Sequence, residues 1–328
     1  MIYNFFNKKI SAHFSQLAEE VGFSILDIGA RTEKTHSNPG IAGDFKFISK
    51  GCDYYGYEPD KEEIKKLNST VNSHWKSQNF ISEALGEVKG KFDLNLHRQP
   101  GFSSKLKAKE DQFKLFSRSM YLQEKEKQIS VKVNSLDSSL THTEILNPCF
   151  MKIDIQGMEL DVFKGASNFL KQQCLGIRIE VYFHQIYEKQ PLFSDIDIYL
   201  RSFGFQPFQF VELHSWRRNS THKFPFIDNK AKIGFSKGQL MHGDIIYLKD
   251  SSCIGKDDLI HQKIRLGLIS LSYQHYDLAH QIFSSLVSKN SKYKTSLAFV
   301  EKLAKADSKT YVLDRWLYWF KKGINLLK

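Results

Sequence analysis

The run FMKIDIQGMELDVFKGA at residues 150–166 constrains the fold more than any other stretch of this sequence. Residues 150–155 form a short apolar run with the length and make-up of a buried strand. A Gln-Gly pair ends the run, and the hydrophobic spacing then becomes that of an amphipathic helix, with Glu159 and Lys164 expected to face solvent. A strand that ends in a glycine turn and leads into a helix is half of a βαβ unit, which predicts a parallel sheet.

Asp154 lies at the end of this strand and is therefore the first functional candidate. In open α/β sheets, ligands bind at the carboxyl ends of the strands. Asp and Gly are also common in turns that serve structure alone. The residues at the ends of the other predicted strands distinguish between these two interpretations.

Three further predicted strands also end in a carboxylate. They are residues 24–29 with Asp27, residues 52–60 with Glu58, and residues 176–181 with Glu180. Strands that alternate with helices at this spacing predict a doubly wound α/β sheet. Further expected elements are helices at 11–21, 61–71 and 196–203, strands at 80–85, 91–97, 129–133, 205–213 and 244–248, a mobile helix or lid at 105–128, and a turn at 136–140.

The repeated acids at strand ends predict a pocket for a nucleoside cofactor. A carboxylate after the second strand, here Glu58, is where nucleoside-binding folds hold ribose hydroxyls. The small pair Gly29-Ala30 after the first strand lets a ligand approach the backbone closely. The alternative is a set of solvated strand ends without a ligand.

The residues after the first strand favour S-adenosylmethionine over a dinucleotide. A dinucleotide site needs the pattern G-x-G-x-x-G, which places a pyrophosphate on a helix N-terminus. Only Gly29 is present, and Glu33 stands where further glycines belong, so a carboxylate would repel the pyrophosphate. S-adenosylmethionine carries no phosphate and has a positive sulfonium, which suits an acid-lined pocket. This predicts a methyltransferase.

Several motifs together resemble the FkbM family of S-adenosylmethionine-dependent methyltransferases. They are DIGAR at 27–31, GYEPD at 56–60, EALGE at 83–87, GFSS at 101–104, MKIDIQGMELDVFKGA at 151–166 and EVYFHQIYEKQPLFSDID at 180–197. WRRN at 216–219 and KGQLMHGDIIYLKD at 237–250 resemble a subgroup whose first motif reads D-x-G-A-R. The resemblance covers residues 22–250. The family usually has Asn in place of Arg31 and Gly in place of Glu33; the subgroup accounts only for Arg31.

The resemblance implies a Rossmann-like fold of the class I methyltransferase type and methyl transfer to oxygen, often on sugars or secondary metabolites. It also implies site roles. The cofactor-binding residues would be Asp27, Gly29 and Ala30 at the methionine end, Glu58 at the ribose, and Glu83 and Ala84 near the adenine.

Asp154 is expected beside the transferred methyl group, as the base or as a group that orients the acceptor. Glu180 and His184 are second catalytic candidates, and the alternative for His184 is packing in a loop. Ser103 and Ser104 are expected to bind the acceptor or to form a turn. Trp216, Arg217 and Arg218 are expected to bind a sugar or its phosphate, or to form a surface turn. Asp154, Glu180 and His184 are also suitable metal ligands, but no spacing motif predicts a divalent metal site.

The net charge of +11 raises the question of nucleic-acid binding. Residues 251–328 hold thirteen Lys/Arg against six Asp/Glu, so +7 of the +11 lies in this tail. No RNA- or DNA-binding motif is present, and a basic tail fits an anionic membrane surface or an acidic partner equally well. Two alternatives to a methyltransferase that acts on sugars or metabolites stay open: a non-catalytic binding module with a methyltransferase-like fold, suggested by Glu33, and an RNA-binding protein or RNA-directed methyltransferase, suggested by the charge.

The sequence divides into an N-terminal helical lead-in at 1–21, a methyltransferase domain at 22–250 and a small, basic α-helical extension at 251–328. Apolar residues between 266 and 286 predict one helical hairpin, which would pack on the domain or on a second subunit of a homo-oligomer. Residues 315–328 resemble an interfacial membrane helix, with a dimer or domain contact as the alternative. Four scattered cysteines and the lack of a signal peptide or membrane span predict a cytoplasmic protein, peripheral at the inner membrane face if that helix binds lipid.

Overall fold

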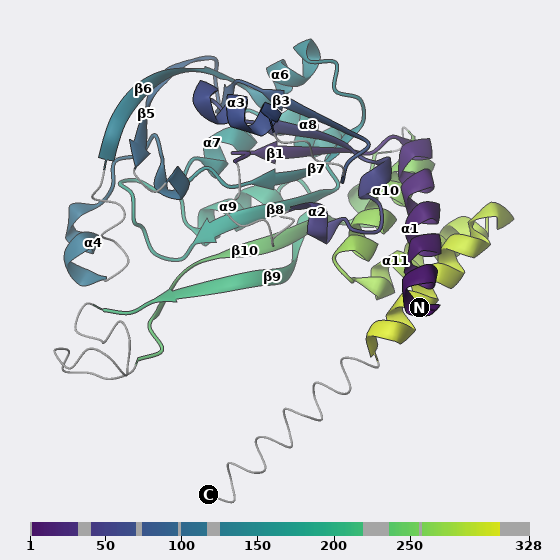
Figure 1. Cartoon of the computed structure of the whole chain (residues 1–328). Coiled ribbons are helices and arrows are strands. Elements are labelled where there is room, and N and C mark those ends of the chain that lie inside the picture. The colour runs from purple at the N-terminus through teal and green to yellow at the C-terminus, as the bar shows by residue number, and fades with distance from the viewer. Residues whose placement is uncertain are drawn as a thin grey trace, which may run out of the picture.

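A seven-stranded sheet in the order β3-β2-β1-β7-β8-β10-β9 forms the centre of the computed structural model (Figure 1). The structure describes residues 2–31, 41–69, 74–97, 100–116, 125–218, 236–255 and 258–308. The five strands from β3 to β8 are parallel, and β10 runs antiparallel to both β8 and β9. The strands are β1 (Ser24–Ile28), β2 (Asp53–Tyr57), β3 (Ser77–Ile81), β7 (Pro148–Ile153), β8 (Gly176–Tyr182), β9 (Phe205–Trp216) and β10 (Gln239–Lys249).

The chain reverses its direction of strand addition between β1 and β7, which lie side by side. It first adds β2 and β3 on one side of β1, and then crosses to place β7 and β8 on the other. Every residue of β1 is buried, as expected for a parallel strand covered on both faces. Such a switch point opens a crevice at the carboxyl ends of the two strands. The predicted α/β class is confirmed.

Helices cover both faces of the sheet (Figure 1). One apolar cluster joins the sheet to α7 (Glu159–Lys164), α8 (Ser167–Gln172) and α9 (Phe193–Arg201). A second cluster on the opposite face joins it to α1 (Ile2–Val21), α2 (Ile41–Asp44), α10 (Leu259–Ser272) and α11 (Tyr276–Val287). The shorter connecting elements are η1 (Ser49–Gly51), α3 (Lys61–Ser69), α6 (Leu136–His142) and η4 (Ser251–Cys253).

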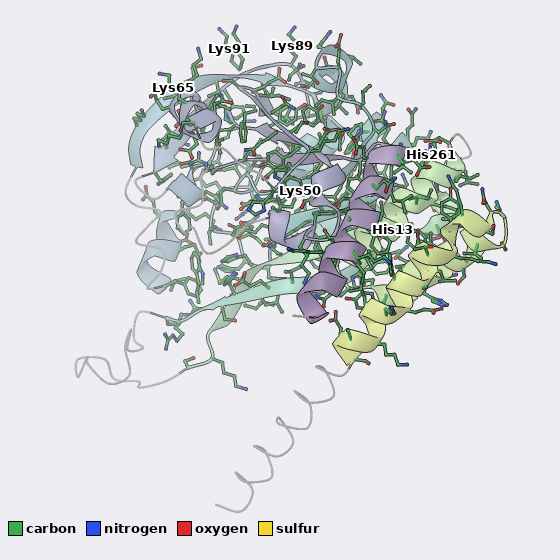
Figure 2. All side chains as sticks on the ribbon, turned by 45° about the vertical axis from the view of Figure 1, so that its right-hand side comes forward. His13, Lys50, Lys65, Lys89, Lys91 and His261 are labelled. Carbon is green, nitrogen blue, oxygen red and sulfur yellow. The ribbon has the colours of Figure 1, made fainter. Side chains whose placement is uncertain are left out.

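The C-terminal helices share a hydrophobic core with α1 and the sheet. Figures 1 and 2 show α1 beside them, and Phe14 of α1 packs its ring against Phe283 of α11 at 6.2 Å between centroids. The buried Arg265 of α10 donates hydrogen bonds to the carbonyl oxygens of Val21 and Gly22, where α1 ends. After η5 (Ser291–Tyr293), residues 294–308 are helical, and His13 of α1 reaches Ser296 at 2.9 Å.

A second, three-stranded sheet in the order β4-β6-β5 lies at the opposite end of the molecule from α1, α10 and α11 (Figure 1). Its strands are β4 (Ala84–Leu85), β5 (Gly90–His97) and β6 (Lys125–Asn134). The segment between β5 and β6 includes η2 (Pro100–Phe102) and α4 (Glu110–Leu115). The mobile helix or lid expected at 105–128 is thus, where described, a short helix and the start of a strand.

Several local predictions were wrong. Glu159 was expected to face solvent but is 3% exposed, because its Oε1 accepts hydrogen bonds from the backbone N–H groups of Ile155 and Gly157 at 3.0 and 3.1 Å. The turn expected at 136–140 is helix α6, whose first turn is capped by the Ser135 hydroxyl. The strand expected at 80–85 is split between β3 and β4, and α1 begins nine residues earlier than expected.

Of the described helices, none is long and apolar enough to cross a membrane. The amphipathic helix predicted at 315–328 lies outside the described residues, as does Glu33. The contact that residues 315–328 were expected to make therefore stays a prediction.

Candidate functional site

A cavity of about 620 Å³ lies at the switch point, between the carboxyl ends of β1, β2 and β7 and the three-stranded sheet. Its volume is within the range of about 300–1,000 Å³ that is usual for small-molecule sites. The structure brings seven of the predicted site residues together in its lining: Asp27, Gly29, Glu58, Glu83, Ala84, Ser103 and Asp154.

The turn after β1 brings the backbone close to the end of β7. Gly29 has a φ of +87°, and a Cβ at this position would lie 2.3 Å from the carbonyl oxygen of Asp154. A side chain is therefore excluded by both strain and contact. The N–H groups of Gly29 and Ala30 both donate to Tyr57 O at 3.0 Å, which fixes the turn against β2. Ala30 is buried and does not line the cavity.

Glu58 places a buried carboxylate in the cavity at the end of β2. The side chain is 1% exposed, and its Oε1 accepts the N–H of Asp60 at 2.8 Å. Arg31 Nε lies 3.4 Å from its Oε2. Burial raises the pKa of Glu58 from 4.5 to about 7, against the opposing effects of Arg31 and the Asp60 N–H. Glu58 therefore titrates near neutral pH.

Glu83 lines the cavity, but two side chains of the protein already bind its carboxylate. Ser139 Oγ donates to one oxygen at 2.7 Å, and Asn134 Nδ2 donates to the other at 3.2 Å. Ala84 and Leu85 of β4 follow it and supply an apolar wall. This part of the cavity thus offers an apolar surface next to a carboxylate whose position is fixed.

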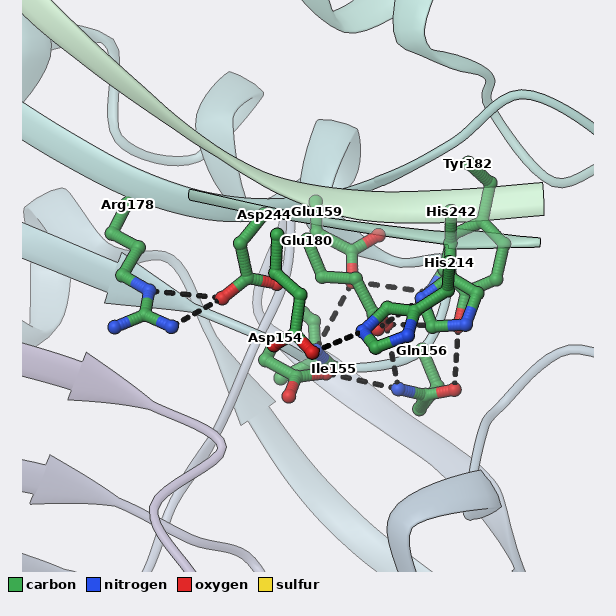
Figure 3. A network of polar contacts seen from close by, with 12 residues as sticks. Asp154, Ile155, Gln156, Glu159, Arg178, Glu180, Tyr182, His214, His242 and Asp244 are labelled. Carbon is green, nitrogen blue, oxygen red and sulfur yellow. Dashed lines mark hydrogen bonds and ion pairs between the residues drawn. The ribbon is translucent and has the colours of Figure 1, made fainter. Parts of the chain in front are cut away.

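Asp154 and Glu180 are joined by the side chain of Gln156 (Figure 3). Gln156 Nε2 donates to Asp154 Oδ1 and to Glu180 Oε2, both at 2.9 Å. Gln156 Oε1 accepts a hydrogen bond from the hydroxyl of Tyr182 at 2.9 Å, so that groups on β8 and at the end of β7 hold the amide in one orientation. Asp154 and Gln156 line the cavity, whereas Glu180 lies beyond it on β8.

The two carboxylates differ in their affinity for a proton. Burial, and then the charge of Glu180, raises the pKa of Asp154. Burial also acts to raise the pKa of Glu180, but hydrogen bonds from His242, Tyr182 and Gln156 outweigh it and leave that pKa below its ordinary value. His242 Nδ1 lies 2.9 Å from Glu180 Oε1. The proton is therefore held preferentially on Asp154, the carboxyl group that faces the cavity.

Lys152 is a cavity residue that was not predicted from the sequence. Its ammonium lies 3.1 Å from Asp27 Oδ1, across the register pair between β7 and β1. Tyr54 of β2 donates to the other oxygen of Asp27 at 2.7 Å. The available signal was a lysine inside an otherwise apolar strand, because a cation in a buried parallel strand requires an acidic partner.

Six predicted site residues lie outside the cavity lining: Ala30, Ser104, Glu180, His184, Trp216 and Arg217. The Ser104 hydroxyl donates to Gln156 O at 2.7 Å and accepts from Leu106 N at 3.0 Å, which is a structural role in the turn beneath Gln156. Ser103, in contrast, lines the cavity, and its Oγ accepts the N–H of His97 at 3.2 Å.

His184, Trp216 and Arg217 also lie away from the cavity lining. His184 Nε2 is 2.7 Å from Gln112 Oε1, and Gln239 Nε2 is 3.3 Å from its Nδ1. Burial, and then Lys109 and Arg218, lower the pKa of His184, which favours a neutral ring held between two amides. Trp216 is 2% exposed and packs edge-on against Phe116 at 6.0 Å.

In the part of the chain that the structure describes, no group of three or more His, Cys, Asp or Glu residues is arranged to hold a metal ion. Asp154 and Glu180 are bridged by an amide, while His184 is bound elsewhere. These three residues, considered above as ligands of a divalent metal, therefore do not form one site.

Comparisons with known proteins show the family of the chain. The family model described as the methyltransferase FkbM domain matches residues 27–207, more than half of the chain. A comparison with curated proteins gives no match. Among solved structures, methyltransferase FkbM of Methylobacillus flagellatus KT is similar at 15% identity with a TM-score of 0.36, over 70% of this chain and 44% of that one. The chain thus spans less than half the length of that protein.

A second similar structure is magnesium protoporphyrin IX methyltransferase of Synechocystis PCC 6803, which was solved with bound S-adenosylmethionine. The identity is 9% and the TM-score 0.33, over 74% of this chain and 79% of that one.

Proposed function

Because the chain belongs to the methyltransferase FkbM family, we propose that it transfers a methyl group from S-adenosylmethionine to a hydroxyl oxygen. The proposed acceptor is a sugar, a glycan such as a surface polysaccharide, or a secondary metabolite. The observation that carries the proposal is the buried carboxylate of Glu58, placed in a cavity at the end of β2 of a methyltransferase sheet.

The donor set of the cavity fits this cofactor. Glu58 has the chemistry to accept the two ribose hydroxyls, and the apolar wall of Ala84 and Leu85 suits an adenine. Carboxylates at Asp27, Glu58 and Asp154 suit a ligand that carries a positive sulfonium and no phosphate. When bound, S-adenosylmethionine supplies an electrophilic methyl group on that sulfonium.

Asp154 is our candidate for the general base. A sugar hydroxyl is a poor nucleophile, and a carboxylate within reach accelerates its reaction by accepting the proton. The raised pKa of Asp154, caused by burial and by Glu180, makes it a stronger base than an exposed carboxylate. Phe92, Phe102 and Ser103 line the same cavity and offer aromatic faces and a hydroxyl to an acceptor.

The first experiment measures cofactor binding and acceptor choice separately. Calorimetry with S-adenosylhomocysteine tests the cofactor, and absence of heat at high ligand concentration would leave only a non-catalytic module. Radiolabelled S-adenosylmethionine is then offered with a panel of sugars, polysaccharides and RNA. Label that survives mild base in a sugar product identifies a methyl ether and excludes a methyl ester. Label confined to RNA would overturn the acceptor class proposed here.

Asp154→Asn tests the proposed base. We expect the variant to bind S-adenosylhomocysteine as the wild type does and to transfer methyl groups about 100-fold more slowly or worse, in line with the usual contribution of general bases. The matched control is Asp161→Asn, a half-buried carboxylate on α7 that pairs with Lys105 at 4.0 Å. Equal rates for the wild type and Asp154→Asn would show that Asp154 is not the base.

A further inference from the structure

Lys152 is a cation in the lining of a cavity that also holds five carboxylates. Its side chain is 24% exposed and lines the cavity together with Asp27 and Asp154. Placing an ammonium in the centre of a sheet is costly unless it is paired. Asp27 supplies the pairing at 3.1 Å, but this contact alone does not explain why Lys152 also faces the cavity.

The contacts of Asp27 change its expected role. Tyr54 occupies one of its oxygens and Lys152 the other, so Asp27 serves to hold the lysine in place. An ammonium has three hydrogens to donate. Within the described part of the chain Lys152 donates one hydrogen bond, to Asp27, which leaves two hydrogens for a ligand.

Lys152 stays protonated because two carboxylates lie near its ammonium. Burial acts to lower the pKa of Lys152, but Asp27 and Asp154 outweigh it and raise that pKa above its ordinary value. A permanent cation that faces a cavity attracts an anionic group of a ligand, and a charged hydrogen bond of this kind is stronger than a neutral one.

We infer that Lys152 binds the carboxylate at the methionine end of S-adenosylmethionine and so positions the cofactor. The inference rests on the proposed function, since it assumes that the cavity takes this cofactor. S-adenosylmethionine ends in an amino acid, and its carboxylate is the only anionic group of the molecule. In this arrangement Asp27 is a positioning residue that acts through Lys152.

The other cations of the cavity are less suitable for binding the carboxylate of the cofactor. Lys66 and Lys105 have side chains that are 66% and 41% exposed, where water screens their charge. Arg31 is 26% exposed and lies 3.4 Å from Glu58, at the end of the cavity that we assign to the ribose. Arg31 is therefore the rival that the experiment must separate from Lys152.

Two ligands distinguish binding of the amino-acid end of the cofactor from binding of its nucleoside end. S-adenosylhomocysteine contains the amino acid, whereas 5′-methylthioadenosine has the same nucleoside and thioether but lacks it. Calorimetry would measure both ligands with the wild type, Lys152→Met, Lys152→Arg, Arg31→Met and the control Lys164→Met, a lysine that is 41% exposed and lies outside the cavity lining. The double variant Asp27→Asn/Lys152→Met removes the pair together and leaves no unpaired buried carboxylate.

We expect Lys152→Met and the double variant to bind S-adenosylhomocysteine about 10- to 100-fold more weakly while keeping their affinity for 5′-methylthioadenosine. Lys152→Arg should recover part of the loss, and Arg31→Met should weaken both ligands alike. Retained binding of 5′-methylthioadenosine also proves that the variants are folded.

Other outcomes overturn the inference in distinguishable ways. Unchanged binding of S-adenosylhomocysteine in the folded variants removes Lys152 from the cofactor site. An equal loss of both ligands in the double variant makes Lys152 a structural residue of the sheet. A selective loss in Arg31→Met assigns the carboxylate to Arg31. If the wild-type protein binds neither ligand, the proposed function fails first and the inference falls with it.

Discussion

The proposed role of Glu58 at the ribose predicts that cofactor binding depends on pH. In that role its carboxylate must be ionised to accept two hydroxyls, and burial raises the pKa of Glu58 to about 7. We therefore expect affinity for 5′-methylthioadenosine to be constant above pH 7 and to fall about tenfold for each pH unit below it, because one proton must be released. Calorimetry between pH 5.5 and 8 measures this slope.

Two variants isolate the contribution of Glu58. Glu58→Gln should bind weakly at every pH and lose the slope. Glu62→Gln, an exposed carboxylate of α3 that pairs with Lys65, should keep the slope of the wild type. A slope that persists in Glu58→Gln would assign the titration to another group and remove Glu58 from the ribose site.

The sequence predicted the positions of some residues of the candidate site and missed those of others. Asp27, Glu58 and Asp154 follow the ends of apolar runs, and the ends of parallel strands meet at one edge, so their convergence was predictable. Lys152 and Gln156 were missed because their roles depend on the register of β7 against β1 and on the loop after β7. His184 was misplaced because the loop after β8 carries it toward Gln112 of α4.

The loop between β7 and α7 depends on Glu159, which binds two of its N–H groups. Burial raises the pKa of Glu159 from 4.5 to about 8. The folded state therefore binds this proton more tightly than the unfolded state does. The stability that Glu159 contributes is fully present below pH 4.5 and is lost as the pH rises toward 8.

Glu159→Gln keeps an acceptor oxygen and removes the titration. We expect the free energy of unfolding of the wild type to fall relative to the variant by about 1.4 kcal/mol for each pH unit between 5 and 8. Urea titrations of both proteins at three pH values measure this difference. If the free energies of unfolding of the two proteins change in parallel with pH, Glu159 titrates as an ordinary carboxyl group.

Helix α1 approaches η1 so closely that only glycine fits at position 51. A Cβ on Gly51 would lie 1.8 Å from the carbonyl oxygen of Ser15, which is backbone of α1 and cannot rotate away. Gly51→Ala should therefore lower the free energy of unfolding by about 1–3 kcal/mol or more. Gly90→Ala is the control, since a Cβ there meets nothing within 4 Å. Similar urea midpoints for the two variants would contradict this packing.

At the level of elements, apolar runs predicted the central strands better than the short helices. β1, β7 and β8 are buried on both faces, and their ends differ from the predicted ones by at most two residues. Helix α6 was taken for a turn because Leu136 alone anchors its first turn in the core, and its start depends on the Ser135 cap. A sequence of seven residues carries too few periodic positions to reveal such a helix.

On the scale of the whole molecule, the C-terminal helices belong to the core that supports the sheet. Leu266 and Leu268 of α10 are fully buried in the same cluster as Phe14 of α1 and Phe150 of β7. The sequence predicted a helical hairpin here and left open whether it packs on the domain or on a second subunit. Hydrophobic periodicity identifies an apolar face of a helix but does not show which surface that face packs against.

This shared core predicts that the sheet does not fold without the C-terminal helices. A chain that ends at residue 255 would expose Phe14, Phe150 and Ile246, which are fully buried in the described structure. We expect it to aggregate or to bind a hydrophobic dye, and to lose binding of S-adenosylhomocysteine. A chain that ends at residue 308 keeps every described helix, so it should bind the ligand and unfold in one cooperative transition. If the shorter chain also binds the ligand and unfolds cooperatively, residues 22–250 form an independent domain, and the C-terminal helices only cover it.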